Sequence, residues 1–336
     1  MATTSPLPLA NGLLRGLADP ARGTRELVSR LGAEMATGRV ADPAEALRHD
    51  FSALGLAERE LHLAGSLEQS IGKGLRVMAA ADAALGGIGD EIERLGDELV
   101  PFVTGSAGVP MDDLAASAWE GFERIVALMN ARLDDGAIFA GGRRDAEATG
   151  SAAAIRADVE ALAAGAADAD DLQARVAAYF APSGDFAANR VVPSAPDAFG
   201  FRIEADRSVA FDMRAGDAGF RDALGAVARI AALAASPHAE TPEAQAYLAT
   251  GAPAALATAT DGVIGLRAAA GRTAAALDRG TAALEDRVAR AAEARNALVG
   301  VDPYETATRL EEEAARLETI YTLTARLSRL RLTDYL

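Results

Sequence analysis

The sequence predicts a mainly α-helical fold, in which long antiparallel, coiled-coil-like helices from both chain ends carry a small α/β domain inserted in the middle. Three observations predict it. Apolar residues recur every three or four positions towards both ends of the chain, which is the spacing of one helix face. Alternation of apolar and polar residues, the period of a half-buried strand, is confined to the middle. Aromatic residues make up only 5% of a chain that is 50% hydrophobic, and this aliphatic composition favours helix–helix packing over a β-sandwich core.

The N-terminal region is expected to begin as a loop and to continue as a helix. Prolines and glycines are frequent between Met1 and Arg25, at Pro6, Pro8, Gly12, Gly16, Pro20 and Gly23. From Thr24 to Met35 the apolar residues at i, i+4 and i+8 form one helical stripe, which consists of Leu27, Leu31 and Met35. Gly38 and the proline that follows it predict a break from Ala36 to Pro43.

Two helices are expected next. The first runs from about Ala44 to Pro101, and its clearest part is a coiled-coil-like seam with spacings of three and four, formed by Leu85, Ile88, Ile92, Leu95 and Leu99. Its glycines cost up to about 1 kcal/mol each relative to alanine, so neighbouring elements must hold this helix in place. The second runs from Met111 to Leu133 and is followed by a short apolar run at Ile138–Ala140.

The middle of the chain combines short helices with one β-hairpin. An alanine-rich, acidic segment from Thr149 to Ala178 predicts one or two short helices. Residues 199–203 and 209–213 alternate apolar and polar side chains across a short polar link, which predicts a hairpin with one buried face. Helical spacing then returns from Phe220 to Leu233, and Pro237 ends it.

The C-terminal third is expected to be helical from about Glu243 to the end, with one interruption from Gly300 to Pro303. Its last piece again shows a three–four pattern, at Leu310, Leu317, Ile320, Leu323 or Thr324, Leu327 and Leu330. Helical ends around a central insertion imply that the two ends pair with each other. We therefore expect terminal helical segments at 1–45 and 300–336, a rod of long helices at 46–139 and 243–299, and an inserted α/β domain at 140–242. The N-terminal part of the terminal segments is expected to be disordered in the monomer.

Composition excludes several classes of function. The 33 basic and 49 acidic residues give a net charge of −16, which argues against an open grip on nucleic acid or on an anionic membrane surface. The chain has no cysteine, so it forms no disulfide and no thiolate zinc site, and its three histidines are too few for a histidine-rich metal site. No apolar run reaches the roughly 18 residues of a membrane span, and no cleavable signal peptide is expected at the start.

The sequence offers no catalytic constellation, and we expect neither enzymatic activity nor a cofactor. Gly72-Lys73-Gly74 lacks the hydroxyl residue and the leading glycine of a phosphate loop. His62 has Glu58 one turn before it but no accompanying nucleophile, so a surface histidine is the simpler interpretation, and His238 is expected in a solvent-exposed loop. The acidic residues 168–171 lack the glycine and the glutamate of a calcium loop. Arg143-Arg144 could bind an anion, but a turn with solvated arginines fits better.

Both ends of the chain resemble one bacterial family. Residues 31–43 (LGAEMATGRVADP) resemble the segment of flagellins and hook–filament junction proteins in which a helix ends at a glycine turn before an Asp-Pro step. The closing residues 314–336 (AARLETIYTLTARLSRLRLTDYL) are similar to the C-terminal helix of flagellins, and residues 138–145 (IFAGGRRD) to a stretch of junction proteins. Residues 209–224 resemble a hairpin-and-helix insert of alphaproteobacterial members. The N-terminus lacks the usual start of the family, and residues 72–89 are richer in glycine.

The resemblance implies a structural subunit of the bacterial flagellum, at the junction between hook and filament (hook-associated protein 3). Flagellin is the alternative within the family, and a cytoplasmic coiled-coil scaffold or signalling module is the alternative outside it. The implied partners are copies of the same chain, other axial proteins and a cytoplasmic export chaperone, and the implied location is extracellular, on the flagellum. The residues expected to pair the helices and to mediate self-association are Leu27, Leu31, Met35, Leu310, Leu317, Ile320, Tyr321, Leu323, Leu327, Leu330, Tyr335 and Leu336.

Overall fold

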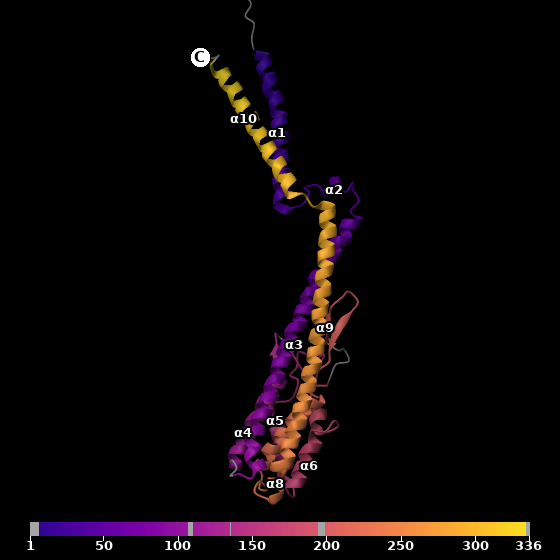
Figure 1. Ribbon diagram of the computed structural model, residues 1–336, viewed down its shortest axis with the longest axis vertical. Helices are drawn as coiled ribbons and strands as arrows, with labels where there is room; N and C mark the ends of the chain where they lie inside the picture. Colours follow the sequence, from indigo (N-terminus) through magenta and orange to yellow (C-terminus); the bar gives the residue numbers. More distant parts are fainter. Residues whose placement is uncertain (1–6, 107–109, 135, 194–198, 334–336) are drawn as a thin grey trace, which may run out of the picture. The chain divides into compact units, whose positions relative to one another are not determined.

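A computed structural model describes residues 7–106, 110–134, 136–193 and 199–333, and of residues 7–17 and 327–333 it describes the backbone. The chain divides into two compact units. The terminal unit consists of Met1–Gly65 and Glu285–Leu336, and the central unit consists of Ser66–Leu284. Long helices come from both chain ends and the only strands among the described residues lie in the middle, so the predicted fold class is confirmed (Figure 1).

The elements follow one another in this order: α1 (Leu7–Thr37), α2 (Pro43–Ala46), α3 (Ser52–Thr104), α4 (Met111–Met129), β1 (Arg132–Leu133), β2 (Gly136–Ala137), α5 (Ala152–Ala164), α6 (Ala169–Tyr179), the π-helical turn η1 (Phe186–Arg190), β3 (Phe199–Arg202), β4 (Ser208–Phe211), α7 (Ala218–Ala234), α8 (Pro242–Ala246), the π-helical turn η2 (Tyr247–Gly251), α9 (Ala252–Val299) and α10 (Pro303–Thr333).

The first helix begins earlier than the sequence predicted. The prediction of a loop up to Arg25 is wrong from Leu7 onward, because α1 starts there and passes through Pro20. Pro8 occupies the first turn, where a missing N–H is tolerated, whereas Pro20 removes one hydrogen bond from the helix interior. The four-residue spacing of Leu9, Leu13 and Leu17 had already indicated one helical stripe in this stretch, and the prediction gave more weight to its prolines and glycines.

The predicted helix from Ala44 to Pro101 is two helices. The short helix α2 ends at Ala46, and the chain turns through Arg48 and His49, both of which have positive φ angles. After the turn, α3 continues without interruption past its glycines and past Pro101. The second predicted helix ends at Met129, because Arg132 and Leu133 pair with Ala137 and Gly136 in a small antiparallel hairpin that periodicity did not reveal.

The central hairpin was predicted correctly. Strands β3 and β4 are antiparallel with Phe201 opposite Val209, and Phe201, Ile203, Phe211 and Met213 are buried while the intervening residues point outward. The buried face covers α3 and α9. A Cβ atom added to Gly74 of α3 would lie 2.8 Å from the ring of Phe201 and 2.8 Å from Leu277 of α9. Gly74 weakens α3 locally, but because it has no side chain it lets the ring of Phe201 approach the axis of α3.

Helix α7 is the centre of the core of the central unit. Helices α4, α5 and α6 all contact it, and its apolar residues are buried around almost its whole circumference. A helix that is apolar all round is stable only when it is enclosed by neighbours. Phe220 of α7 packs edge-on against Phe139, which also explains why the apolar run after β2 is buried.

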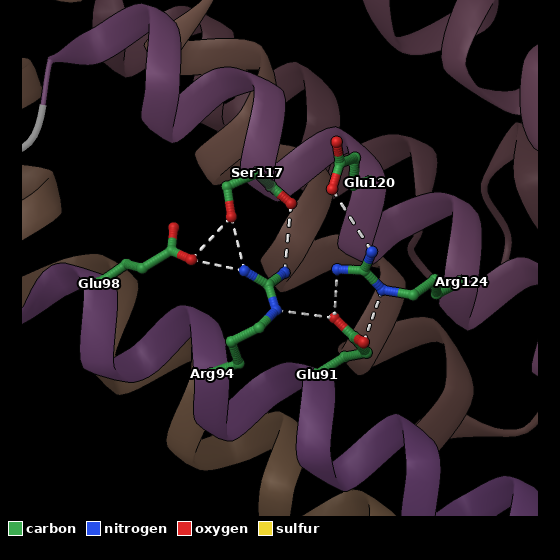
Figure 2. Close-up of polar contacts among 6 residues, drawn as sticks. All are labelled: Glu91, Arg94, Glu98, Ser117, Glu120 and Arg124. Carbon is green, nitrogen blue, oxygen red and sulfur yellow. Dashed lines mark hydrogen bonds and ion pairs between the residues drawn. The ribbon is translucent and has the colours of Figure 1, made fainter.

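An ion-pair network fastens α3 to α4 within the central unit (Figure 2). Glu91 receives hydrogen bonds from two arginines, Arg94 of its own helix at 3.0 Å and Arg124 of α4 at 2.6 Å and 3.0 Å. Arg94 also contacts Glu98 and Ser117, and the hydroxyl of Ser117 donates to Glu98 at 2.7 Å. Partial burial raises the pKa of Glu91, but the hydrogen bonds from Arg124 and Arg94 outweigh burial and leave that pKa below its ordinary value.

Candidate self-association surface

The terminal unit contains the helix pair that the sequence predicted. Helices α1 and α10 contact each other in antiparallel fashion; they lie closest where α1 ends and α10 begins, and they diverge towards the chain termini (Figure 1). On α10 the less exposed positions are Ala307 and a series at spacings of four and three: Thr306, Leu310, Glu313, Leu317, Ile320 and Thr324. On α1 the less exposed positions, among those with described side chains, are Ala21, Thr24, Leu27, Val28, Leu31, Gly32 and Glu34. This is the heptad-like spacing expected of two helices that meet along one seam.

The twelve predicted self-association residues fall into three groups. Leu31 and Ile320 are buried, and Leu27, Leu310 and Leu317 are half-buried, so these five lie on the seam side of their helices. Three others are exposed, namely Met35, Tyr321 and Leu323. Leu327 and Leu330 belong to α10, but their side chains lie outside the described part of the chain, as do Tyr335 and Leu336 altogether. The sequence pattern allowed either Leu323 or Thr324 on the seam, and Thr324 is the one that is half-buried.

A polar contact that the sequence did not reveal also joins the two helices. The guanidinium of Arg25 donates from Nε to the hydroxyl of Tyr321 at 3.0 Å, and its carbon atom lies 5.7 Å from the centre of the tyrosine ring. Tyr321 is 44% exposed, so its ring covers the rim of the seam. Thr24 and Thr306 are the buried polar residues of the pair. Their side chains are polar and so do not contribute to an apolar pattern, although their positions continue the stripes.

The base of the pair is a short backbone ladder between the two chain segments. The Val40 N–H donates to the Val299 carbonyl at 2.9 Å, and the Val301 N–H donates to the Gly38 carbonyl at 3.2 Å. Gly38 has a φ of +67°, the left-handed conformation that ends a helix most readily at glycine. At Gly300 a Cβ atom would lie 2.4 Å from the Asn296 carbonyl oxygen, so this position also requires glycine.

Two Asp-Pro steps begin the helices next to this ladder. Asp42 precedes Pro43, and its carboxylate accepts hydrogen bonds from the N–H groups of residues 44 and 45 at 2.9 Å and 3.1 Å. Asp302 precedes Pro303 in the same way and accepts from residues 304 and 305 at 2.8 Å and 3.1 Å. An aspartate N-cap followed by proline at the first helical position is a strong helix start. The two motifs therefore fix where α2 and α10 begin.

An open groove of about 690 Å³ lies between α1, α2 and α10. Its apolar part is formed by Leu27, Leu31, Val40 and Val301. Seven carboxylates line it, against two arginines, Arg30 and Arg309; the carboxylates are Glu34, Asp42, Glu45, Asp302, Glu305, Glu312 and Glu313. Asp42 and Asp302 are helix caps, Glu34 accepts from the Ala41 N–H at 3.0 Å, and Glu305 and Glu313 form ion pairs within α10. Glu45 and Glu312 have no hydrogen bond or ion pair among the described residues.

The pair buries little apolar surface for its length. Each of its helices has 31 residues, and Leu31 and Ile320 are the large apolar side chains that are buried among those described in α1 and α10. Outside the seam, Met35, Tyr304 and Leu323 are 45%, 84% and 45% exposed. Long helices obtain most of their stability from tertiary packing. The pair is therefore held by a narrow seam, and part of its apolar surface stays exposed within the terminal unit.

The described residues show neither a metal-binding cluster nor a helix that could span a membrane. Within the part of the chain that the structure describes, no three His, Cys, Asp or Glu side chains are arranged to hold a metal ion. None of the helices, over the residues described, combines the length and the apolar character needed to cross a bilayer. His238, predicted to be solvent-exposed, is half-buried, and its Nε2 lies 3.4 Å from the Ala166 carbonyl oxygen.

The fold belongs to the class of helical proteins whose first and last helices pair. No protein-family model matches the chain, and no curated protein matches it. Among solved structures, it is similar to a protein proposed to be a flagellar hook-associated protein, from Vibrio parahaemolyticus, with a TM-score of 0.54 and 14% sequence identity. The similarity covers 74% of this chain and 99% of the other. At this identity, the likeness establishes a shared fold.

Proposed function

We propose that this chain is a structural subunit of the bacterial flagellum, and specifically a junction protein that joins the hook to the filament. The observation that carries the proposal is the antiparallel pair of α1 and α10, which leaves apolar side chains exposed on its outer faces. The shared fold with the proposed hook-associated protein of Vibrio parahaemolyticus supports the same assignment. Flagellin, the filament subunit, is the alternative within this class.

In this proposal the work of the protein is mechanical and not catalytic. The terminal segments 1–45 and 300–336 form an inner layer that packs against sister subunits, residues 46–139 and 243–299 form a rod, and residues 140–242 form a domain at the outer surface. Copies of the chain contact one another and also contact other axial proteins, flagellin and hook-associated protein. A cytoplasmic chaperone binds the chain before export, which proceeds without a cleaved signal peptide.

The location of the protein tests the flagellar assignment directly. Immunogold labelling of isolated flagella should place it at the junction of hook and filament, and it should disappear from the cell exterior when flagellar export is blocked. Detection only in the cytoplasm of cells with intact flagella would refute the assignment and would favour a coiled-coil scaffold. Copy number separates the two flagellar roles, because sheared filaments contain thousands of flagellin subunits and only a single ring of junction subunits.

A pair of variants tests the role of the outer face of α10. Leu323 is 45% exposed, and Leu323→Asp should leave the helix pair folded but should reduce motility and incorporation into flagella. Thr322→Asp adds the same charge at a neighbouring exposed position and serves as the matched control. Equal incorporation of both variants would show that the apolar outer face has no role. Deletion of residues 314–336 should abolish incorporation altogether, and motility restored by the truncated chain would contradict this arrangement.

A further inference from the structure

Charge is distributed very unevenly along the helix pair. The half towards the chain termini, Leu7–Arg25 of α1 with Tyr321–Thr333 of α10, contains six arginines and one carboxylate, Asp19. The half towards the ladder, Glu26–Thr37 with Pro303–Ile320, contains three arginines and seven carboxylates. We call these halves the tip and the base. Because the helices are antiparallel, the arginine-rich halves of both helices point to the same end of the pair, and the acidic halves of both lie towards the ladder.

The arginines of the tip are concentrated near the end of α10. Arg326, Arg329 and Arg331 lie within six residues that contain no acidic side chain, and they occupy a helix that continues to Thr333. The side chain of Arg326 is exposed. Cations on the last turns of a helix complement its C-terminal dipole, and in the sequence aliphatic residues stand between these arginines.

The groove at the base has the opposite properties. Seven carboxylates surround an apolar floor that includes Leu31 and Val301, and the two arginines in its wall leave it strongly negative. Glu45 and Glu312 have no ion-pair partner among the described residues, and Glu45 lies across the groove from α10, on α2. A positively charged, leucine-rich helix end therefore matches the groove in both its charge and its apolar character.

We infer that the groove at the base of one molecule receives the arginine-rich tip of α10 from a second copy of this chain. The contact joins two different surfaces, tip to base, and is therefore heterologous. Each molecule has one of each surface, so the contact repeats from copy to copy, and the rotation between copies decides whether a closed ring or an open filament results. The inference rests on the proposed function for its biological meaning and on the charges alone for its chemistry.

Opposite charge reversals test the inference on the purified full-length chain. The tip variant carries Arg326→Glu, Arg329→Glu and Arg331→Glu, and the base variant carries Glu45→Arg and Glu312→Arg. Sedimentation velocity over a range of protein concentrations measures association, and circular dichroism confirms that each variant keeps its helix content. Wild type should form assemblies larger than dimers at low salt. Each variant alone should associate at least tenfold more weakly, because like charges then meet in the contact.

A matched control and a mixture isolate the contact from general effects of charge. Glu311→Arg with Glu318→Arg changes the net charge as much as the base variant does, at exposed positions of α10 that do not line the groove, and it should associate like wild type. An equimolar mixture of the tip and base variants should recover association, since glutamates of one variant then meet arginines of the other. High salt should weaken the wild-type contact, because the screening length falls to about 3 Å at 1 M.

Several results would overturn the inference. A wild-type chain that stays monomeric at every concentration and salt level would do so, as would tip and base variants that associate like wild type, or a mixture that fails to recover. Assemblies that stop at two copies would point to a symmetric antiparallel dimer and contradict the repeating contact. These measurements need no flagellum, so their failure leaves the cellular location test of the proposed function unaffected, and the reverse also holds.

Discussion

Two glycines of the same helix should respond differently to the same substitution: alanine should stabilise the protein at one of them and not at the other. Both Gly74 and Gly89 lie inside α3 and within the central unit. Alanine in a helix interior is favoured over glycine by about 0.8–1.0 kcal/mol. At Gly89 a Cβ atom would meet nothing within 4 Å, so Gly89→Ala should increase the free energy of unfolding by nearly this full amount.

At Gly74 the added methyl has no room. Its Cβ would lie 2.8 Å from Cγ of Phe201 and 2.8 Å from a methyl group of Leu277, which is closer than carbon atoms pack. The terminal methyl group of Leu277 can move by a change of rotamer, but Cγ of Phe201 can move away only if the hairpin β3–β4 shifts. Overpacking of this kind costs about 1–3 kcal/mol. After subtraction of the helix-propensity gain, Gly74→Ala should be neutral or should destabilise the central unit by up to about 2 kcal/mol.

The assay follows from the composition of the chain. Trp119 is the one tryptophan, and it is buried in α4 of the central unit, so its fluorescence reports the unfolding of that unit. Urea titrations should give a higher midpoint than wild type for Gly89→Ala, and a midpoint no higher than wild type for Gly74→Ala, at an unchanged slope. If Gly74→Ala proves as stabilising as Gly89→Ala, then the hairpin does not pack on α3 as described.

Three further predictions concern pH and the ends of the helices. The pKa of Glu91 in the folded protein lies below its ordinary value of 4.5, so the stability that Glu91 contributes is present above pH 4.5 and is lost as the pH falls towards the lower, folded pKa. Glu91→Gln should therefore flatten the acid side of the curve of stability against pH, read from Trp119 fluorescence. An unchanged curve would show that the ion-pair network is not formed. Gly38→Ala should lower the free energy that protects the ladder N–H groups from hydrogen exchange by roughly 1–2 kcal/mol, because alanine disfavours the left-handed φ, and Gly38→Asn should be intermediate. Equal protection in wild type and both variants would contradict the left-handed conformation. Asp302→Ala should cost the start of α10 about 1 kcal/mol, measured by hydrogen exchange, whereas Glu311→Ala, away from the cap, should cost much less.

Local signals predicted most elements because each leaves a period in the sequence. The alternation around Phe201 and Phe211 predicted the hairpin and its buried face, and the three–four spacing from Leu310 to Ile320 predicted a seam on the last helix. The hairpin β1–β2 has strands of two residues, which are too short to show any alternation, and it was missed. The loop expected before Arg25 was wrong because prolines and glycines were given more weight than the leucine spacing.

The seam between α1 and α10 follows only in part from apolar spacing, for the same reason. Apolar spacing found Leu31 and Ile320, which are buried, but it also selected Met35 and Leu323, which are exposed. A helix with apolar residues on more than one face does not reveal which face meets its partner inside the chain. Thr306 and Thr24 were overlooked because their polar side chains do not contribute to an apolar pattern, although both are buried.

By itself the sequence determined the helical class, the central position of the strands and the amphipathic character of both chain ends, because these follow from composition and from periods of a few residues. Only the tertiary structure decided which faces meet. Arg25 and Tyr321 are 296 residues apart, and no local pattern links them. From the sequence, Gly74 only weakens a helix; the structure shows that it makes room for the ring of Phe201. The separation of positive tip from negative base likewise arises only when two distant helices are laid antiparallel, since the charge of each half is a sum over both.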